Sequence, residues 1–169
     1  MLRHALLTLA ALMLVASCAG TSIPVSGSSK DAVTEVIERP NSFPSYPQAG
    51  KTYLSFSRGH GFQVNYLAKG RAWLWYPGNT TVVPEEWKTD TISGTKAICW
   101  RHPSDSYNPV TRKSGGSYAC ESMSLAQKTI VASLSGDPFN LRSGAVPYRL
   151  DRCDAPEEFT FDRATFGCN

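Results

Sequence analysis

Segments in which hydrophobic and polar side chains alternate fill most of the chain between residues 51 and 123. The alternation is clearest in residues 52–56 and 62–67, and a return segment at 71–76 follows the loop 68–70, whose glycine suits a hairpin turn. Further short strands are expected at 80–83, 86–89, 96–100 and 118–122. Strands of this length and spacing predict a mainly β fold, either a small antiparallel sheet or a partly closed barrel.

Two other segments have helical or mixed patterns. Residues 31–38 place four apolar side chains, from Ala32 to Ile37, on one side of a helix. This predicts a short helix that either docks on the domain or binds a partner. Residues 124–134 begin like a helix but contain a Thr-Ile-Val centre, and β-branched side chains also suit a strand. We leave this segment open, with a strand favoured, so the fold contains one or two short helices.

The first 17 residues form a separate segment. A short apolar run follows Arg3 and ends at Val15-Ala16-Ser17-Cys18. The charged start, apolar middle and small-residue exit are typical of a secretory signal, and the run is too short to span a bilayer, which takes about 20 apolar residues. The four final residues resemble the cleavage motif of bacterial lipoproteins. The alternative is an ordinary secretory signal whose removal discards Cys18.

The resemblance to lipoproteins implies a lipid anchor on Cys18. In that class the cysteine becomes the new N-terminus and carries two or three fatty acyl chains such as palmitate, which is enough for stable membrane attachment. Ala19 in the next position favours the outer membrane, with the protein facing the periplasm. Residues 18–50, rich in Ser, Gly and Pro, are expected to form a flexible tether, and residues 51–169 a single β-rich domain.

The remaining cysteines are even in number, as expected for an exported, disulfide-bonded domain: Cys99, Cys120, Cys153 and Cys168. Four cysteines allow three pairings. We favour Cys99 with Cys120 and Cys153 with Cys168, because each pair is local and encloses turn-rich sequence. A four-cysteine zinc site is the alternative, but the chain has no C-x-x-C motif, so no metal or cofactor is expected.

Composition argues against several functions. The chain has 17 Lys and Arg against 14 Asp and Glu, and no long basic run, so nucleic acid is not an expected partner. His60 and His102 carry no metalloprotease motif, and the adjacent Glu85 and Glu86 would point to opposite faces of a strand. We therefore expect no catalytic residues. An envelope hydrolase would require one of the histidines to lie beside a carboxylate or hydroxyl in a cleft.

Aromatic residues and one loop are the candidates for a binding surface. Trp73 and Trp75 fall on one face of the segment 71–76, with Leu74 and Tyr76 on the other. One interpretation is ordinary packing on both faces; the other is an exposed aromatic platform for a sugar ring or a protein. The loop 101–113, inside the first expected disulfide, offers four further contact residues: Arg101, His102, Tyr107 and Arg112.

A second resemblance covers residues 59–147. The run from Gly61 to Asn79, then Trp87-Lys88, Ile98-Cys99-Trp100 and Tyr107-Asn108-Pro109-Val110-Thr111, resembles small exported proteins of alphaproteobacteria with no assigned activity. The resemblance implies a folded domain and transfers no catalytic residue. The expected function is a non-enzymatic interaction or accessory domain of the cell envelope. A cell-wall glycan-binding module, or an inhibitor of a wall-cleaving enzyme, is the first alternative, and a hydrolase the second.

Overall fold

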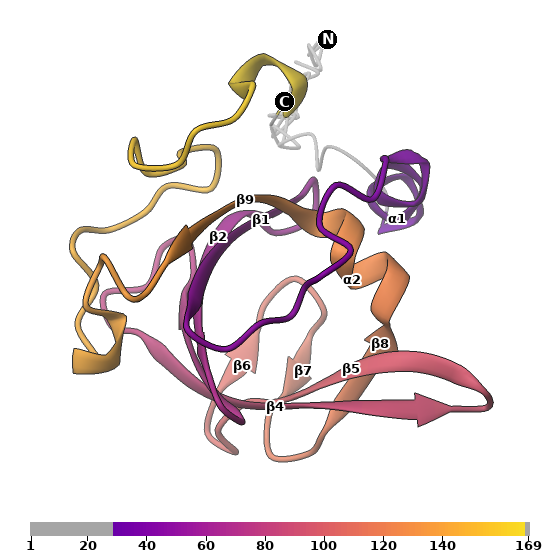
Figure 1. Ribbon diagram of the computed structural model, residues 1–169. Helices are drawn as coiled ribbons and strands as arrows, with labels where there is room; N and C mark the ends of the chain where they lie inside the picture. The colour runs from indigo at the N-terminus through magenta and orange to yellow at the C-terminus, as the bar shows by residue number, and fades with distance from the viewer. Residues whose placement is uncertain (1–28, 168–169) are drawn as a thin grey trace, which may run out of the picture.

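The computed structural model describes residues 29–167, in which one antiparallel sheet curls into a half-barrel (Figure 1). Its seven strands lie in the order β8-β5-β4-β3-β2-β1-β9. Their bounds are Lys51–Ser57 (β1), Gly61–Ala68 (β2), Arg71–Trp75 (β3), Val83–Ile92 (β4), Thr95–Arg101 (β5), Ala119–Ser122 (β8) and Ile130–Ser135 (β9). A separate two-stranded hairpin consists of β6 (Tyr107–Asn108) and β7 (Lys113–Ser114). The mainly β, partly closed fold expected from the alternating pattern is confirmed.

The strand prediction was wrong at one place, and at another the structure resolves a segment that the sequence left open. Instead of two strands at 80–83 and 86–89, one strand, β4, runs from Val83 to Ile92 because the chain continues to pair with β5 on its far side. Residues 124–134 are neither all helix nor all strand: helix α2 covers Met123–Thr129, and β9 begins at the β-branched pair Ile130-Val131. Helix α2 carries the chain across the concave side of the sheet, from β8 to β9 (Figure 1).

The predicted N-terminal helix is present and docks on the domain. Helix α1 spans Ser29–Glu38 and packs against α2 and β1, with Val36 buried. After the helix, Tyr46 is buried edge-on against Tyr53, with ring centroids 4.8 Å apart. The side-chain amide of Gln127 in α2 also donates to the carbonyl of Tyr46, at 3.0 Å. The chain from Val36 to Tyr46 is therefore part of the packed domain, which corrects the expectation of a flexible tether up to residue 50.

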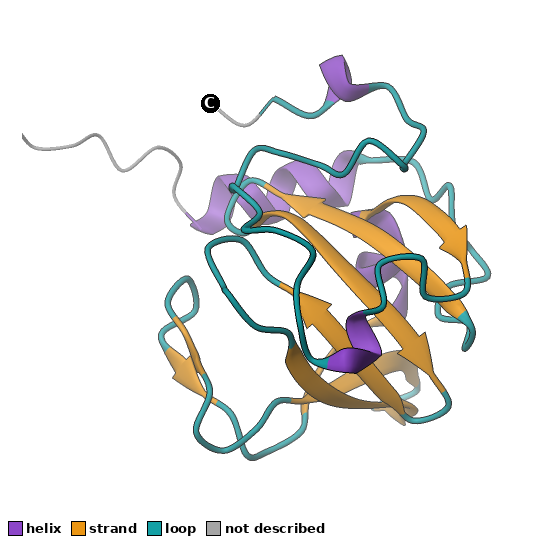
Figure 2. Ribbon diagram, turned by 90° about the vertical axis from the view of Figure 1, so that its left-hand side faces the viewer, coloured by secondary structure: helices purple, strands orange, loops and turns teal. Residues whose placement is uncertain are grey.

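Both faces of the sheet are covered, which accounts for the bulky side chains on both. On the concave face, Tyr53, Leu67 and Ile98 pack with Tyr46 and with Ala126 of α2. On the convex face, the C-terminal segment from residue 136 onward lies over β1, β2 and β3 (Figure 2). That segment contains the short helices η1 (Leu141–Ser143) and η2 (Arg163–Thr165). It contributes four buried side chains to this outer core: Phe139, Leu141, Leu150 and Phe159. No helix in residues 29–167 has the length and apolar character needed to cross a bilayer.

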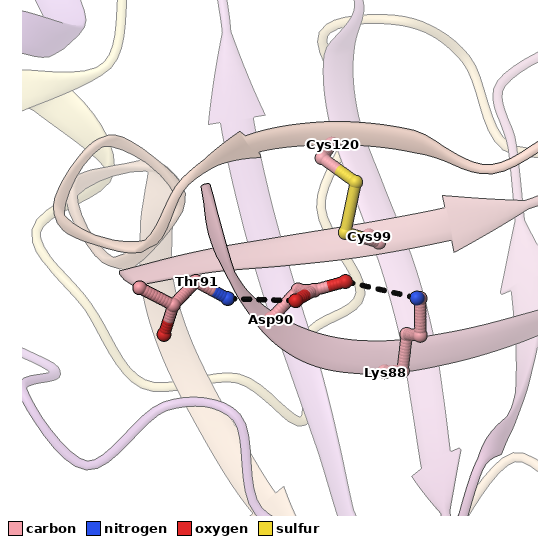
Figure 3. The surroundings of a disulfide bond; sticks show 5 residues. All are labelled: Lys88, Asp90, Thr91, Cys99 and Cys120. Atoms are coloured by element: carbon pink, nitrogen blue, oxygen red, sulfur yellow. Dashed lines mark hydrogen bonds and ion pairs between the residues drawn. A yellow bond between two sulfur atoms is a disulfide. The ribbon is translucent and has the colours of Figure 1, made fainter. Parts of the chain in front are cut away.

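The first expected disulfide is confirmed. Cys99 in β5 and Cys120 in β8 are directly opposite in the strand register and are bonded, as Figure 3 shows. Beside them on β4, Lys88 donates to the carboxylate of Asp90 at 2.9 Å (Figure 3). Cys168 lies outside the described residues, so its pairing with Cys153 stays a prediction.

Substitution of Gly70 by alanine should lower the free energy of unfolding by about 1 kcal/mol, because a side chain disfavours the left-handed backbone. Gly70 has φ of +71° in the β2–β3 hairpin, and an added Cβ would meet nothing within 4 Å, so conformation alone is tested. Urea denaturation measures the change. The exposed neighbour Lys69 is the control: Lys69→Ala should leave the unfolding midpoint almost unchanged. Equal effects of the two substitutions would show that the turn imposes no such requirement.

Candidate functional site

A cavity of about 260 Å³ opens on the concave side of the half-barrel. Along β2, the inward-facing positions change from Leu67, in the apolar core under α2, to Asn65 and Gln63, which line the cavity. The same change occurs along β1, where Tyr53 is followed by the inward-facing Ser55. The concave face therefore has an apolar end that holds α2 and a polar end that surrounds open space.

A buried carboxylate forms the centre of this polar end. The side chain of Glu85 on β4 is only 2% exposed, and its Oε1 lies 2.7 Å from Nδ1 of His102. The side-chain amide of Asn65 donates to its other oxygen, Oε2, at 2.8 Å. With Nδ1 of the imidazole directed at Glu85, Nε2 is the ring nitrogen left for other partners. The three side chains thus form a hydrogen-bonded row from β2 through β4 to the end of β5.

The second histidine also lines the cavity. Nδ1 of His60, in the β1–β2 turn, lies 3.3 Å from the hydroxyl oxygen of Ser57. Its Nε2 lies 3.5 Å from the amide nitrogen of Asn108, which reaches in from β6. Burial, and secondarily the charge of Arg152, lowers the pKa of His60. The hydrogen bond with Glu85 raises the pKa of His102. One cavity therefore holds two imidazoles that the protein drives toward opposite protonation states.

The two histidines should titrate on either side of the ordinary imidazole value of about 6.5 when followed by NMR of their ring protons, His102 above and His60 below. The protonated His102 adds stability that is complete below its unfolded pKa and is lost as the pH rises through its folded pKa. His60 stabilises the fold in its neutral form. This contribution is complete above the unfolded pKa of His60 and is lost as the pH falls through its lowered folded pKa.

Glu85→Gln is the control for this titration. It should lower the pKa of His102, whose shift depends first on Glu85, and leave that of His60 in place. An unchanged His102 pKa in this variant would contradict the role assigned to the carboxylate.

The expectation that Glu85 and Glu86 point to opposite faces is confirmed. Glu86 faces outward, where it forms an ion pair with Arg101 and accepts a hydrogen bond from the hydroxyl of Tyr118 at 3.2 Å. The partner of Glu85 was missed from the sequence. The turn at Ser93-Gly94 sets the β4–β5 register with Glu86 opposite Arg101, so the next position on each strand brings Glu85 to His102. Counting residues outward from that two-residue turn is the signal that would have found the pair.

The tryptophan platform does not exist as expected. Trp75 is completely buried, with its ring edge-on to Phe139 and Tyr148 at 5.5 and 4.8 Å between centroids. Trp73 is half-buried and stacks on Tyr66 at 5.7 Å. The guanidinium group of Arg142 lies 5.5 Å from the centre of the Trp73 ring. Ordinary packing, the other interpretation of these residues, fits both positions.

The four candidate residues of the loop 101–113 do not share one surface. Arg101 and His102 are adjacent and point to opposite faces, the first toward Glu86 and the second into the cavity. Tyr107 is 61% exposed on β6, and Arg112 is exposed on the connection between β6 and β7. Only His102 of the four therefore belongs to the cavity, and Asn108, which was not a candidate, joins it there.

Within residues 29–167, no three side chains from His, Cys, Asp and Glu come together in a way that suits a metal ion. The Glu85–His102 pair has instead an amide, that of Asn65, as its third member. The cavity thus presents hydrogen-bonding and ionisable groups to whatever enters it.

Comparisons of this chain with protein-family models, with curated proteins and with solved structures found no match.

Proposed function

We propose that this protein binds a small polar ligand in the concave cavity while a lipid on Cys18 attaches it to the membrane of the bacterial envelope. The buried Glu85 carboxylate is the observation that carries this proposal. Removing a carboxylate from water costs several kcal/mol unless partners compensate, and a buried apolar residue often serves stability as well or better. Glu85 has its partners, His102 and Asn65, but they border open space rather than packed side chains. Such an arrangement is typical of a ligand site, where stability is given up for function.

The cavity limits the size of the ligand. Its volume of about 260 Å³ lies just below the range of about 300–1,000 Å³ that holds drug-sized molecules. A single sugar ring, an amino acid or a comparable metabolite fits this space, whereas a polymer would enter by one terminal unit. The proposal therefore replaces the tryptophan face with the cavity as the place where a cell-wall component or another envelope metabolite would bind.

A matched pair of variants tests whether binding occurs in the cavity. Ser55 lines the cavity on β1, and Ser55→Leu would fill part of it; Ser135→Leu makes the same chemical change at an exposed position on the neighbouring strand β9. We expect a screen of sugars, amino acids, amines and carboxylic acids by protein NMR to find compounds that perturb His102 and Asn65. Ser55→Leu should abolish these perturbations and Ser135→Leu should preserve them. Binding that survives Ser55→Leu would place the ligand elsewhere.

Membrane attachment is tested at Cys18, which lies outside the described residues. In bacterial cells, the protein should fractionate with membranes and incorporate labelled palmitate, because two or more acyl chains anchor a protein stably. Cys18→Ala should eliminate the label and release the protein into the soluble fraction. Ser17→Ala is a neighbouring control that keeps the cysteine. A membrane fraction unchanged by Cys18→Ala would contradict the lipid anchor.

Acid–base catalysis is a second candidate function, favoured by the pairing of His102 with Glu85. A carboxylate bonded to Nδ1 fixes the imidazole tautomer and makes Nε2 a proton acceptor, as in many hydrolases. This meets the condition set above for an envelope hydrolase. With any cavity ligand that contains an ester or amide bond, product formation over time distinguishes turnover from binding. His102→Asn should stop turnover at least as strongly as it weakens binding, and a ligand recovered intact would exclude hydrolysis of that compound.

A further inference from the structure

The charged groups that line the cavity are mostly acidic. Glu85 from β4 and Glu121 from β8 both face it, and none of the residues between 29 and 167 that line it is a Lys or Arg. The whole chain has the opposite balance, with a net charge of +3, so the scarcity of fixed positive charge is local. Arg152 acts on His60 from outside the lining, where its guanidinium is bound to the carbonyl of Arg58. Among the described residues that line the cavity, His102 is the one whose pKa shift favours a positive charge, since the pKa of His60 is lowered.

The positive charge of a protonated His102 would offset the negative charge of Glu85 and leave that of Glu121. When His102 is protonated, its imidazole forms an ion pair with Glu85. Glu121 has no ion-pair partner among residues 29–167, and it lines the cavity beside Trp100. Burial raises the pKa of its carboxyl, and a hydrogen bond with the Trp100 side chain opposes that shift. Burial raises the pKa of the Tyr46 phenol, and the charges of Glu121 and then Glu85 add to the shift. Both carboxylates therefore act on the same region of the cavity, next to that phenol.

Aromatic rings line the same space. Tyr46, Tyr76 and Trp100 contribute to the lining, together with Tyr53, against which Tyr46 packs edge-on. The face of an aromatic ring attracts a cation, most strongly for tryptophan, and the attraction grows when the site is shielded from water. Carboxylates beside aromatic rings are the combination that recognises ammonium groups, because one supplies charge and the other a surface that suits methyl or methylene groups.

We propose that the ligand of this cavity is a small organic ammonium compound, held by Glu121 and the aromatic rings of Trp100 and Tyr46. This inference rests on the proposed function, which it makes more specific. A carboxylate or phosphate ligand would face two acidic groups with one imidazolium to offset them. A neutral sugar would gain nothing from the charge of Glu121. An ammonium group gains from both the carboxylate and the rings, and its polar substituents find hydrogen-bond partners in Gln63 and Asn65.

Choline and its neutral isostere 3,3-dimethylbutan-1-ol test the role of charge, because the two have almost the same shape. Titration of the purified full-length protein, followed by the NMR signal of the Trp100 indole and by calorimetry, should give saturable binding of choline. The isostere should bind at least about tenfold more weakly, as expected when a shielded cation–π contact and a charged hydrogen bond are both lost. Equal affinities for the two compounds would overturn the inference.

Two glutamates provide a matched pair of variants. Glu121→Gln should weaken choline binding by about tenfold, since it removes the carboxylate that no cationic side chain among residues 29–167 offsets. Glu86→Gln makes the same change on the outer face, where Glu86 pairs with Arg101, and should leave the affinity unchanged. An equal effect of both variants would mean that only the overall charge of the protein matters, which would contradict a site at Glu121.

Acetate and N-acetylglucosamine, titrated in parallel, separate the failure of this inference from failure of the proposed function. Ethanolamine is titrated as a second ammonium compound beside choline. Suppose that acetate or N-acetylglucosamine binds saturably, that Ser55→Leu blocks this binding, and that neither choline nor ethanolamine binds. This result would overturn the ammonium inference and retain the cavity as a ligand site. If acetate, N-acetylglucosamine, choline and ethanolamine all leave the signals of His102 and Trp100 unperturbed, and the wider screen finds no binding compound, both the ammonium inference and the proposed function would be overturned.

Discussion

Trp75→Ala should lower the free energy of unfolding by about 3–5 kcal/mol, the usual range for removing a large aromatic side chain from a core. The indole has no exposed surface and fills the space between β3 and the C-terminal segment, in contact with Phe139 and Tyr148. Phe139 is itself packed against Phe159, at 5.7 Å between ring centroids, so it cannot fill the gap without leaving that contact. Since domains of this kind are stable by about 5–15 kcal/mol, the loss would remove much of the total. Urea denaturation followed by circular dichroism measures it.

Trp73→Ala is the comparison for this experiment, because Trp73 lies on the same face two residues earlier but is only half-buried. It should cost clearly less than Trp75→Ala, through the lost stacking on Tyr66 and the lost contact with Arg142. Trp75→Phe should recover part of the stability, since it keeps a ring and removes an indole nitrogen that has no hydrogen-bond partner among the described residues. A Trp75→Ala protein as stable as the parent would contradict the packing role, and would restore the platform interpretation.

Loss of the Cys99–Cys120 bond should lower the free energy of unfolding by about 3 kcal/mol, the value that the chain-entropy model gives for a loop of this size. The two cysteines are 21 residues apart in the sequence, and the enclosed chain includes the whole β6–β7 hairpin. Without the bond, the unfolded chain gains freedom in that segment, while β8 is still held to β5 by backbone hydrogen bonds and by the hydrogen bond between Trp100 and Glu121. Cys99→Ala combined with Cys120→Ala isolates this bond, and thermal unfolding monitors the result.

The same double variant carries an internal control. A reducing agent should lower the midpoint of the parent protein, and any further decrease that it causes in the double variant reports on a bond elsewhere, such as the one predicted for Cys153. If the double variant and the parent unfold at the same temperature under oxidising conditions, the disulfide does not stabilise the fold as expected. Because Trp100 and Glu121 directly follow the two cysteines in the sequence, ligand binding should weaken along with stability.

The parts of the fold that depend on local pattern could be predicted from the sequence. Alternation located β1, β2 and β3, and the spacing of Cys99 and Cys120 led to the correct pair. The strand β9 could not be separated from α2, because the segment 124–134 satisfies helical and strand patterns in turn, and pairing with β1 decides where the helix ends. The burial of Tyr46 also depends on distant partners, since a Ser- and Pro-rich segment looks flexible until α2 is placed against it.

The candidate site was harder to predict than the fold. Glu85 and His102 belong to different strands, and their contact follows from the register of one hairpin rather than from any motif. The face that carries Trp73 and Trp75 could be core or an exposed platform, because the sequence does not show that the C-terminal segment covers the convex side. Each error comes from long-range packing, which composition and periodicity describe only as an average.

The pairing of the first strand with the last has a consequence for how this chain reaches its native state. Strand β1 pairs with β9, and Phe159 belongs to the outer core, so one set of contacts joins the beginning of the domain to its end. Contacts between such distant segments form slowly, since a long loop must close before they can form. During synthesis, the last strand of the sheet and the cover of its convex face can be added only after the C-terminal segment has emerged.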